Sequence, residues 1–143
     1  MTGLKCYFKK IHNQLEANFN RALRKHGLTI TQFDILAYLA SCGTPKTLTD
    51  ISAHFGVRHT SVIHVLKVLE QKGFITKNKA SDARSKTIAL TAQAEQLVMT
   101  IHQKDPLVNE VLFRGLSKED LQYLEKMLQQ IYANLESDAF HNI

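Results

Sequence analysis

The chain has 143 residues, of which 44% are hydrophobic, and it carries a formal net charge of +5. This length suits one compact domain with its own core, so we expect a single domain over residues 1–143 that needs no disulfide or structural metal. Lysines interrupt the first thirty residues, no run of eighteen apolar residues occurs, and the two cysteines are far apart, which predicts a cytoplasmic protein with no membrane partner.

The N-terminal part of the chain predicts two helices. Apolar residues within 4–23 step by three and four, which is typical of a long amphipathic helix, and Gly27 should end it. A second, more apolar helix follows. Thr31 and Asp34, three residues apart, resemble a capping box at its start, and Gly43 should stop it.

Two shorter helices and a hairpin are expected next. The third helix should start near Thr49 and break at Gly56, and the fourth should follow at once and run to Gly73. The pattern then changes to residues that favour strands. Residues 74–76 and 87–90 predict a small hairpin with a charged, polar tip between its strands.

The C-terminal part predicts two more helices. Thr91 can cap the first of them, and Pro106 should kink or break it because proline lacks a backbone N–H. Ser117 and Asp120 match a capping box before a last amphipathic helix. The expected fold class is therefore mostly α with a small β-hairpin wing, that is, a winged helix-turn-helix over residues 45–90 between helical arms.

The arms, over residues 1–30 and 92–143, carry more apolar surface than the winged helix can cover. Uncovered apolar stripes at both ends of a chain predict a homodimer whose interface is built from both termini. The alternative is that the arms fold back on the domain as a monomeric cap.

The segment 45–90 carries eight basic and three acidic residues, so its net charge of +5 equals that of the whole chain. Concentrated positive charge is the footprint of a polyanion binder, although a basic solvated surface would have the same composition. At about 100° per residue, the fourth helix separates into an apolar and a polar face. Its start and its polar face supply the side chains expected to contact DNA, which are Arg58, His59, Thr60, Ser61, His64 and Lys67.

The hairpin tip predicts a second contact with DNA. An arginine on a protruding wing suits the minor groove, whose negative potential attracts it, and we assign this role to Arg84. Asp82 would pair with Arg84 or cap the turn and so support the shape of the wing. The other basic residues expected to contact DNA here are Lys77, Lys79 and Lys86.

Several motifs stand in the order and spacing of a known family. They are residues 48–55, 56–62 and 69–75, then Asp82-Ala83-Arg84 and Leu90-Thr91. Together they resemble the MarR family of bacterial transcriptional regulators. The resemblance implies a homodimer formed by the first and last helices, a palindromic operator, and release from DNA when a small molecule or oxidant acts between the arms and the DNA-binding lobes. His64 replaces an arginine and Ala94 a glycine that are common in the family.

Cys6 lies where the organic-hydroperoxide-sensing, OhrR-like branch of this family carries its reactive cysteine. The resemblance makes Cys6 a candidate redox sensor, but Lys10 and Asn20 stand where that branch has its partner tyrosines. The alternative is that Cys6 is a small packed hydrophobe. Among seven histidines, only His12 shares a helix face with an acid, Glu16, at ligand spacing, so we expect no metal and no other cofactor.

These features favour a DNA-binding regulator over two other classes of protein. An enzyme is not expected, because the sequence has no Gly-rich phosphate loop, no paired carboxylates in a plausible cleft and no nucleophile with an evident base. The other alternative is a winged helix that binds protein without specific DNA binding, and the polar, basic fourth helix argues against it. We expect a sequence-specific regulator, more commonly a repressor in this family, with room near the arms for an anionic aromatic ligand.

Overall fold

The computed structural model describes residues 3–79 and 86–143, so Asp82 and Arg84 lie outside the described residues. The chain forms two compact units, residues 1–102 and 103–143. Among the described residues, no helix is both long enough and apolar enough to cross a bilayer.

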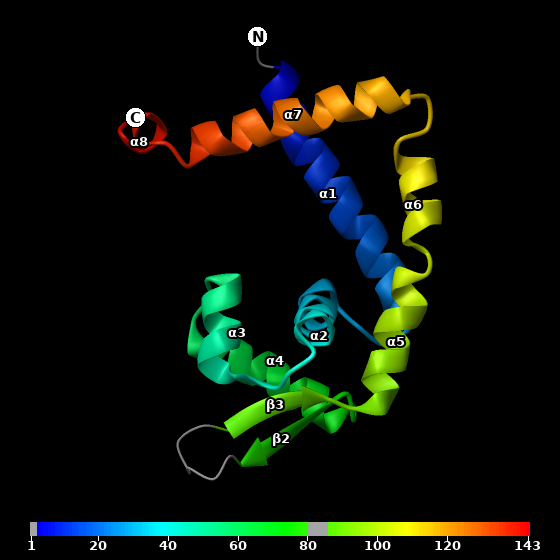
Figure 1. Cartoon of the computed structure of the whole chain (residues 1–143), viewed down its shortest axis with the longest axis vertical. Helices are drawn as coiled ribbons and strands as arrows, with labels where there is room; N and C mark the ends of the chain where they lie inside the picture. Colours follow the sequence, from blue (N-terminus) through cyan, green and yellow to red (C-terminus); the bar gives the residue numbers. More distant parts are fainter. Residues whose placement is uncertain (1–2, 80–85) are drawn as a thin grey trace. The chain divides into compact units, whose positions relative to one another are not determined.

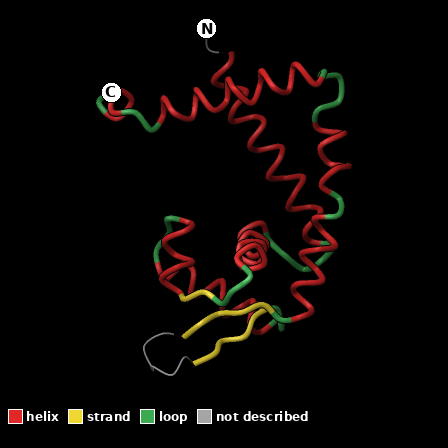
Figure 2. Tube along the Cα trace, in the orientation of Figure 1, coloured by secondary structure: helices red, strands yellow, loops and turns green. Residues whose placement is uncertain are grey.

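The first unit contains the expected winged helix-turn-helix. Its helices are α1 (Gly3–Arg24), α2 (Ile30–Cys42), α3 (Leu48–Phe55), α4 (His59–Gln71) and α5 (Ala92–His102), and its strands are β1 (Lys46–Thr47), β2 (Ile75–Lys79) and β3 (Lys86–Leu90). Figure 1 shows β2 and β3 side by side, with β3 leading directly into α5. The second unit contains α6 (Asp105–Leu112), α7 (Lys118–Leu135) and α8 (Asp138–His141). The mostly helical fold class with a small sheet is confirmed (Figure 2).

The wing belongs to an antiparallel sheet in the order β1-β3-β2. In the hairpin, Ile75 pairs with Leu90 at one end and Lys79 pairs with Lys86 at the other. Strand β2 extends further than the expected strand over residues 74–76, because this pairing continues through polar residues. Strand β1 was not expected at all, since two residues are too few to show an alternating pattern.

One helix start lies two residues earlier than the sequence predicted. Helix α2 is capped by Thr29, whose Oγ1 accepts a hydrogen bond from the Gln32 backbone N–H at 3.2 Å, while the Gln32 side chain accepts from the Thr29 N–H. Thr31 therefore lies inside the first turn, and its expected capping box with Asp34 does not form. Helix α3 begins at Leu48, close to the predicted Thr49, and Thr47 caps it in the same way.

The predictions for the later helices are confirmed. The Ala94 N–H donates to Thr91 Oγ1 at 3.2 Å, so Thr91 caps α5. The helical arm breaks after His102, and Pro106 lies in the first turn of α6, where a missing N–H does no harm. Ser117 and Asp120 form the capping box of α7, with reciprocal distances of 2.9 and 3.0 Å.

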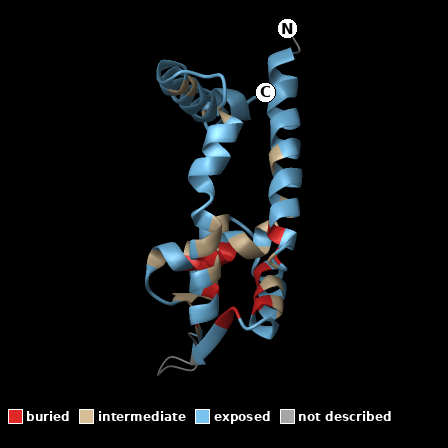
Figure 3. Cartoon of the chain, turned by 90° about the vertical axis from the view of Figure 1, so that its right-hand side faces the viewer, coloured by how far each residue is buried: buried red, intermediate tan, exposed pale blue. Residues whose placement is uncertain are grey.

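The buried core lies in the first unit. Leu36, Ile51, Leu66 and Leu69 are each at most 2% exposed, and α5 adds Ala94 and Val98. Residues 103–143 are all described, and none of them is buried (Figure 3). The second unit therefore has no core of its own within this chain.

Candidate nucleic-acid interface

The turn between α3 and α4 sets the direction in which α4 leaves the core. The capping box of α3 joins the Thr47 N–H to Asp50 Oδ2 at 3.0 Å, and this backbone hydrogen bond holds the pKa of Asp50 below its ordinary value. At the other end, Gly56 has φ of +62°, a left-handed conformation that favours glycine. The chain then reverses, and the Val57 N–H donates to the Ser52 carbonyl at 3.2 Å.

A ring stack also holds α3 against α2. The Tyr38 ring of α2 lies over the His54 ring of α3, with centroids 3.9 Å apart and planes 17° from parallel. Phe55 meets both rings edge-on. The helix that supports α4 is therefore fixed to the core by aromatic packing as well as by its caps.

Helix α4 has one buried and one exposed face, as its sequence periodicity predicted. Val62, Leu66 and Leu69 are buried in the core. The opposite face is polar and exposed and consists of Thr60, His64, Lys67 and Gln71. One residue breaks the pattern, because Ile63 is 46% exposed.

The start of α4 is suited to negative charge. Arg58 occupies the N-cap position, makes no side-chain capping bond and is exposed, and the first turn contains no acidic residue. Helix N-termini attract anions because their first N–H groups and the helix dipole point toward the ligand. His59 lies beside α3, with its Nε2 3.5 Å from Thr49 Oγ1, and Ser61 is exposed. These side chains can donate hydrogen bonds to phosphates or to base edges.

The basic residues of this segment are not equivalent. Lys72 donates from Nζ to the Gly27 carbonyl and to Gln32 Oε1, the latter at 3.3 Å, so it ties the end of α4 to the turn between α1 and α2. Lys77 Nζ lies 3.9 Å from Glu70 Oε1, which joins β2 to α4. Lys67 is exposed on the polar face. The charge count of the sequence could not make these distinctions.

The outer ends of β2 and β3 each carry a lysine. The register places Lys79 and Lys86 at directly paired positions, and the Lys86 side chain is exposed. The expected groove contact, Arg84, and its support, Asp82, lie outside the described residues.

Cys6 and His12, the residues considered for oxidant and metal sensing, have different surroundings in the structure. Cys6 is a free thiol on α1 and is exposed within this chain. His12 Nε2 lies 3.6 Å from Glu16 Oε2, and both side chains are more than half exposed. Within residues 3–79 and 86–143, no three potential metal ligands lie together.

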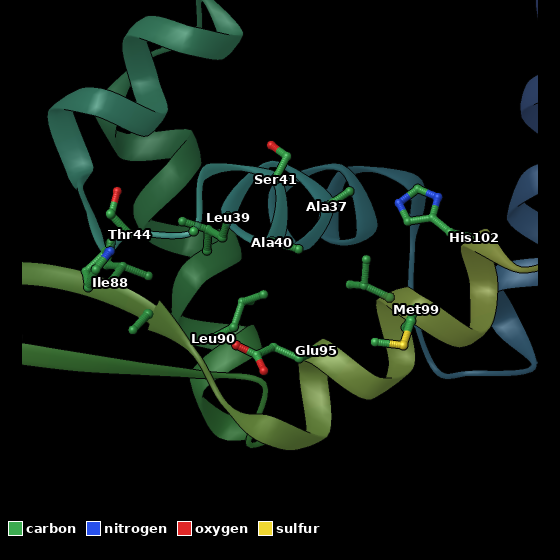
Figure 4. A pocket seen from close by; sticks show the side chains of 14 residues that line it. Ala37, Leu39, Ala40, Ser41, Thr44, Ile88, Leu90, Glu95, Met99 and His102 are labelled. Carbon is green, nitrogen blue, oxygen red and sulfur yellow. The ribbon is translucent and has the colours of Figure 1, made fainter.

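A pocket of about 620 Å³ lies in the first unit between α2, β3 and α5. Leu39 and Ile88 (Figure 4), which are buried, contribute to its apolar part together with buried Val98. Glu95 and Met99 of α5 lie along one side, and Glu95 points toward Leu90 in Figure 4. Glu95 is the acid among the lining residues, and none of them is lysine or arginine. The imidazole of His102 also lines the pocket, so the prediction of room for an anionic aromatic ligand is not tested by this lining.

Comparisons with known proteins point in one direction. The sequence profile of the MarR family matches residues 26–85. An uncharacterized HTH-type transcriptional regulator, YwoH of Bacillus subtilis (strain 168), is 31% identical over 114 residues, which cover 78% of this chain and 82% of that protein.

Solved structures share the fold. The MepR–DNA complex of S. aureus has a TM-score of 0.81 at 23% identity and covers 93% of this chain and 98% of its own. FabT of Streptococcus pneumoniae in complex with DNA has a TM-score of 0.82 at 21% identity and covers 93% of this chain and 95% of its own.

Proposed function

The chain belongs to the MarR family of transcriptional regulators, and from this premise we propose that it binds a pseudo-palindromic operator in duplex DNA as a homodimer. The observation that carries the proposal is the division of α4. Its apolar side is buried, while its opposite side offers exposed donors and acceptors beside a helix start without acidic residues. A recognition helix needs this division to read base edges from the major groove.

The proposed contacts fall into two groups. From α4 and its start, Arg58, His59, Thr60, Ser61, His64 and Lys67 would face the major groove and its phosphates. From the wing, Lys77, Lys79 and Lys86 would neutralise phosphates, and Arg84, supported by Asp82, would enter the minor groove. The exposed side chain of Lys86 at the outer end of β3 supports this assignment, because a phosphate could neutralise its charge.

The homodimer is supported by apolar side chains that their own units leave uncovered. On α1, Leu4, Phe8 and Ile11 are between 46% and 69% exposed. On α7, Leu128, Ile131 and Leu135 follow one helix face and are between 38% and 45% exposed. We propose that a second copy covers these faces through a two-fold axis, which would present two recognition helices to two half-sites about one helical turn apart.

Selection of bound fragments from random duplexes tests this function. We expect one enriched palindrome, with an affinity that falls steeply as salt rises, because neutralised phosphates release counterions. Arg84→Ala should weaken binding to many sequences alike, whereas His64→Ala should change the preferred sequence. Absent or salt-insensitive binding would leave the winged helix as a protein-binding module.

We further propose that a small molecule or an oxidant releases the protein from DNA and that release relieves repression, the commoner mode in this family. The small-molecule site would be the pocket between α2, β3 and α5, since β3 pairs with the wing strand β2 and α2 packs on α4. A ligand that separates these elements would change the spacing of the wing and the recognition helix. Because the lining is largely apolar and includes the carboxylate of Glu95 but no lysine or arginine, we propose an apolar neutral or cationic ligand.

Matched probes test the two routes of release. Benzyltrimethylammonium and benzoate have similar size and opposite charge. The cation should raise the unfolding temperature and weaken DNA binding, and Glu95→Gln should reduce both effects. For the oxidant route, cumene hydroperoxide should release wild-type protein but not Cys6→Ser. If benzoate binds better, or if the cysteine variant responds equally, the corresponding route is wrong.

A further inference from the structure

An exposed isoleucine stands within the polar side of α4. Ile63 is 46% exposed, whereas Val62 beside it and Leu66 three residues later are each 2% exposed. The apolar face of the helix thus does not extend to Ile63, and the side chain contributes little to the core. A β-branched residue is also a weaker helix former than lysine or glutamate at an exposed site, so helix stability does not account for it.

The neighbours of Ile63 are those proposed to contact DNA. On a helix, residues three and four positions apart lie together, which places Ile63 between Thr60 and Lys67, both exposed. Glu70, two turns further along the same flank, lies 3.9 Å from Lys77 of β2. Ile63 is therefore on the flank of α4 that faces the wing, within the proposed contact surface.

The chemistry of the major groove gives such a side chain one partner. Base edges there present hydrogen-bond donors and acceptors, and the C5-methyl group of thymine is the apolar feature. Resting on the function proposed above, we propose that Ile63 reads a thymine in each operator half-site by packing against its methyl group. A polar side chain at this position would not gain from that methyl, so Ile63 determines sequence specificity rather than general affinity.

Replacing thymine by deoxyuridine removes only the methyl group and so tests the contact directly. Duplexes of the selected operator are made with one symmetric pair of thymines replaced at a time, and their dissociation constants are measured at one salt concentration. For one pair, wild-type protein should lose about fourfold in affinity per half-site, the value expected from about 0.8 kcal/mol for a buried methyl-sized group.

The variant Ile63→Ala should bind the thymine and deoxyuridine duplexes equally at that pair. Ile63→Gln, which replaces the branched apolar side chain by one ending in an amide and suits a helix better, should behave in the same way. Both variants should melt close to the wild-type temperature, because exposed substitutions change stability little. The matched control is Val57→Ala in the preceding turn, where the side chain is 45% exposed. It should retain the methyl dependence.

The outcomes separate this inference from the proposed function. Salt-sensitive operator binding with no deoxyuridine effect at any thymine would overturn the role of Ile63 and leave the function intact. A methyl dependence that persists in both Ile63 variants and disappears in Val57→Ala would assign the contact to the turn, which also overturns the inference. If no duplex is bound specifically, the proposed function itself is wrong.

Discussion

Lys67 and Lys72 carry the same charge five residues apart on and just after α4, yet their surroundings predict different roles. Lys67 is exposed on the polar face. Lys72 donates hydrogen bonds to the Gly27 carbonyl and to Gln32 Oε1, so its ammonium group is used within the fold. We expect Lys67→Gln to weaken DNA binding and Lys72→Gln to weaken folding.

The expected change in salt dependence follows from the phosphate contact of Lys67, and the expected loss of stability follows from the hydrogen bonds of Lys72. In a homodimer, Lys67→Gln removes two phosphate contacts, and each contributes about 0.9 to the slope of log K against log salt, so the slope should become shallower by about 1.8. Lys72→Gln should leave that slope unchanged. Its lost hydrogen bonds are exposed, so they should cost about 1 kcal/mol and lower the unfolding temperature by about 3 °C.

Fluorescence anisotropy over a salt series gives the slopes, and thermal unfolding followed by circular dichroism gives the stabilities. Each variant serves as the charge-matched control of the other. The reasoning fails if Lys72→Gln reduces the salt slope as much as Lys67→Gln does, because that would make Lys72 a phosphate contact despite its partners in the fold.

Three further predictions concern stability and assembly. Asp50 has a lowered pKa in the folded protein, so its contribution to stability is present above its ordinary pKa near 3.8. That contribution is lost as pH falls through the lower folded value. Asp50→Asn should therefore make stability depend less on pH in that range. Thr91→Val removes hydrogen bonds to Gly73 and from Ala94 and should cost about 1–2 kcal/mol in denaturant unfolding. Leu128→Glu should yield a folded monomer in sedimentation, since it places charge on the proposed dimer face.

Each of these predictions has a contrary outcome. An unchanged acid limb in Asp50→Asn would mean that the capping box does not persist in solution. Thr100→Val removes only a hydrogen bond within α5, so a loss as large as that of Thr91→Val would contradict the bridging role of Thr91. Gln129→Glu adds the same charge beside Leu128; if it also gives a monomer, charge alone and not the apolar face disrupts the dimer.

The sequence predicted features that depend on neighbouring residues, such as helix faces and most helix starts. The two faces of α4 followed from helical periodicity, and the start of α7 followed from Ser117 and Asp120. At α2 the same logic chose the wrong threonine, because Thr29 and Thr31 both have a suitable partner three residues later. Only the fold of the preceding turn, where Gly27 has φ of +72°, places the cap at Thr29.

Contacts between distant residues could not be predicted in this way. Strand β1 forms because Lys46 pairs with Ile88, and the sequence of two residues gives no sign of such a distant partner. The charge count treated Lys72 like every other basic residue. Its hydrogen bond to the Gly27 carbonyl shows that its ammonium group contributes to the fold. Likewise, only the tertiary structure brings Glu95 and His102 to the same pocket.

Two lysines of the wing, Lys77 and Lys86, would respond to salt in different ways. Added salt screens the contact between Lys77 and Glu70, whose charged atoms lie 3.9 Å apart and join β2 to α4. In the proposed complex, dissolved ions would also compete with phosphate for the exposed Lys86 side chain. High ionic strength would therefore loosen both the attachment of the wing to the recognition helix and its proposed contact with DNA.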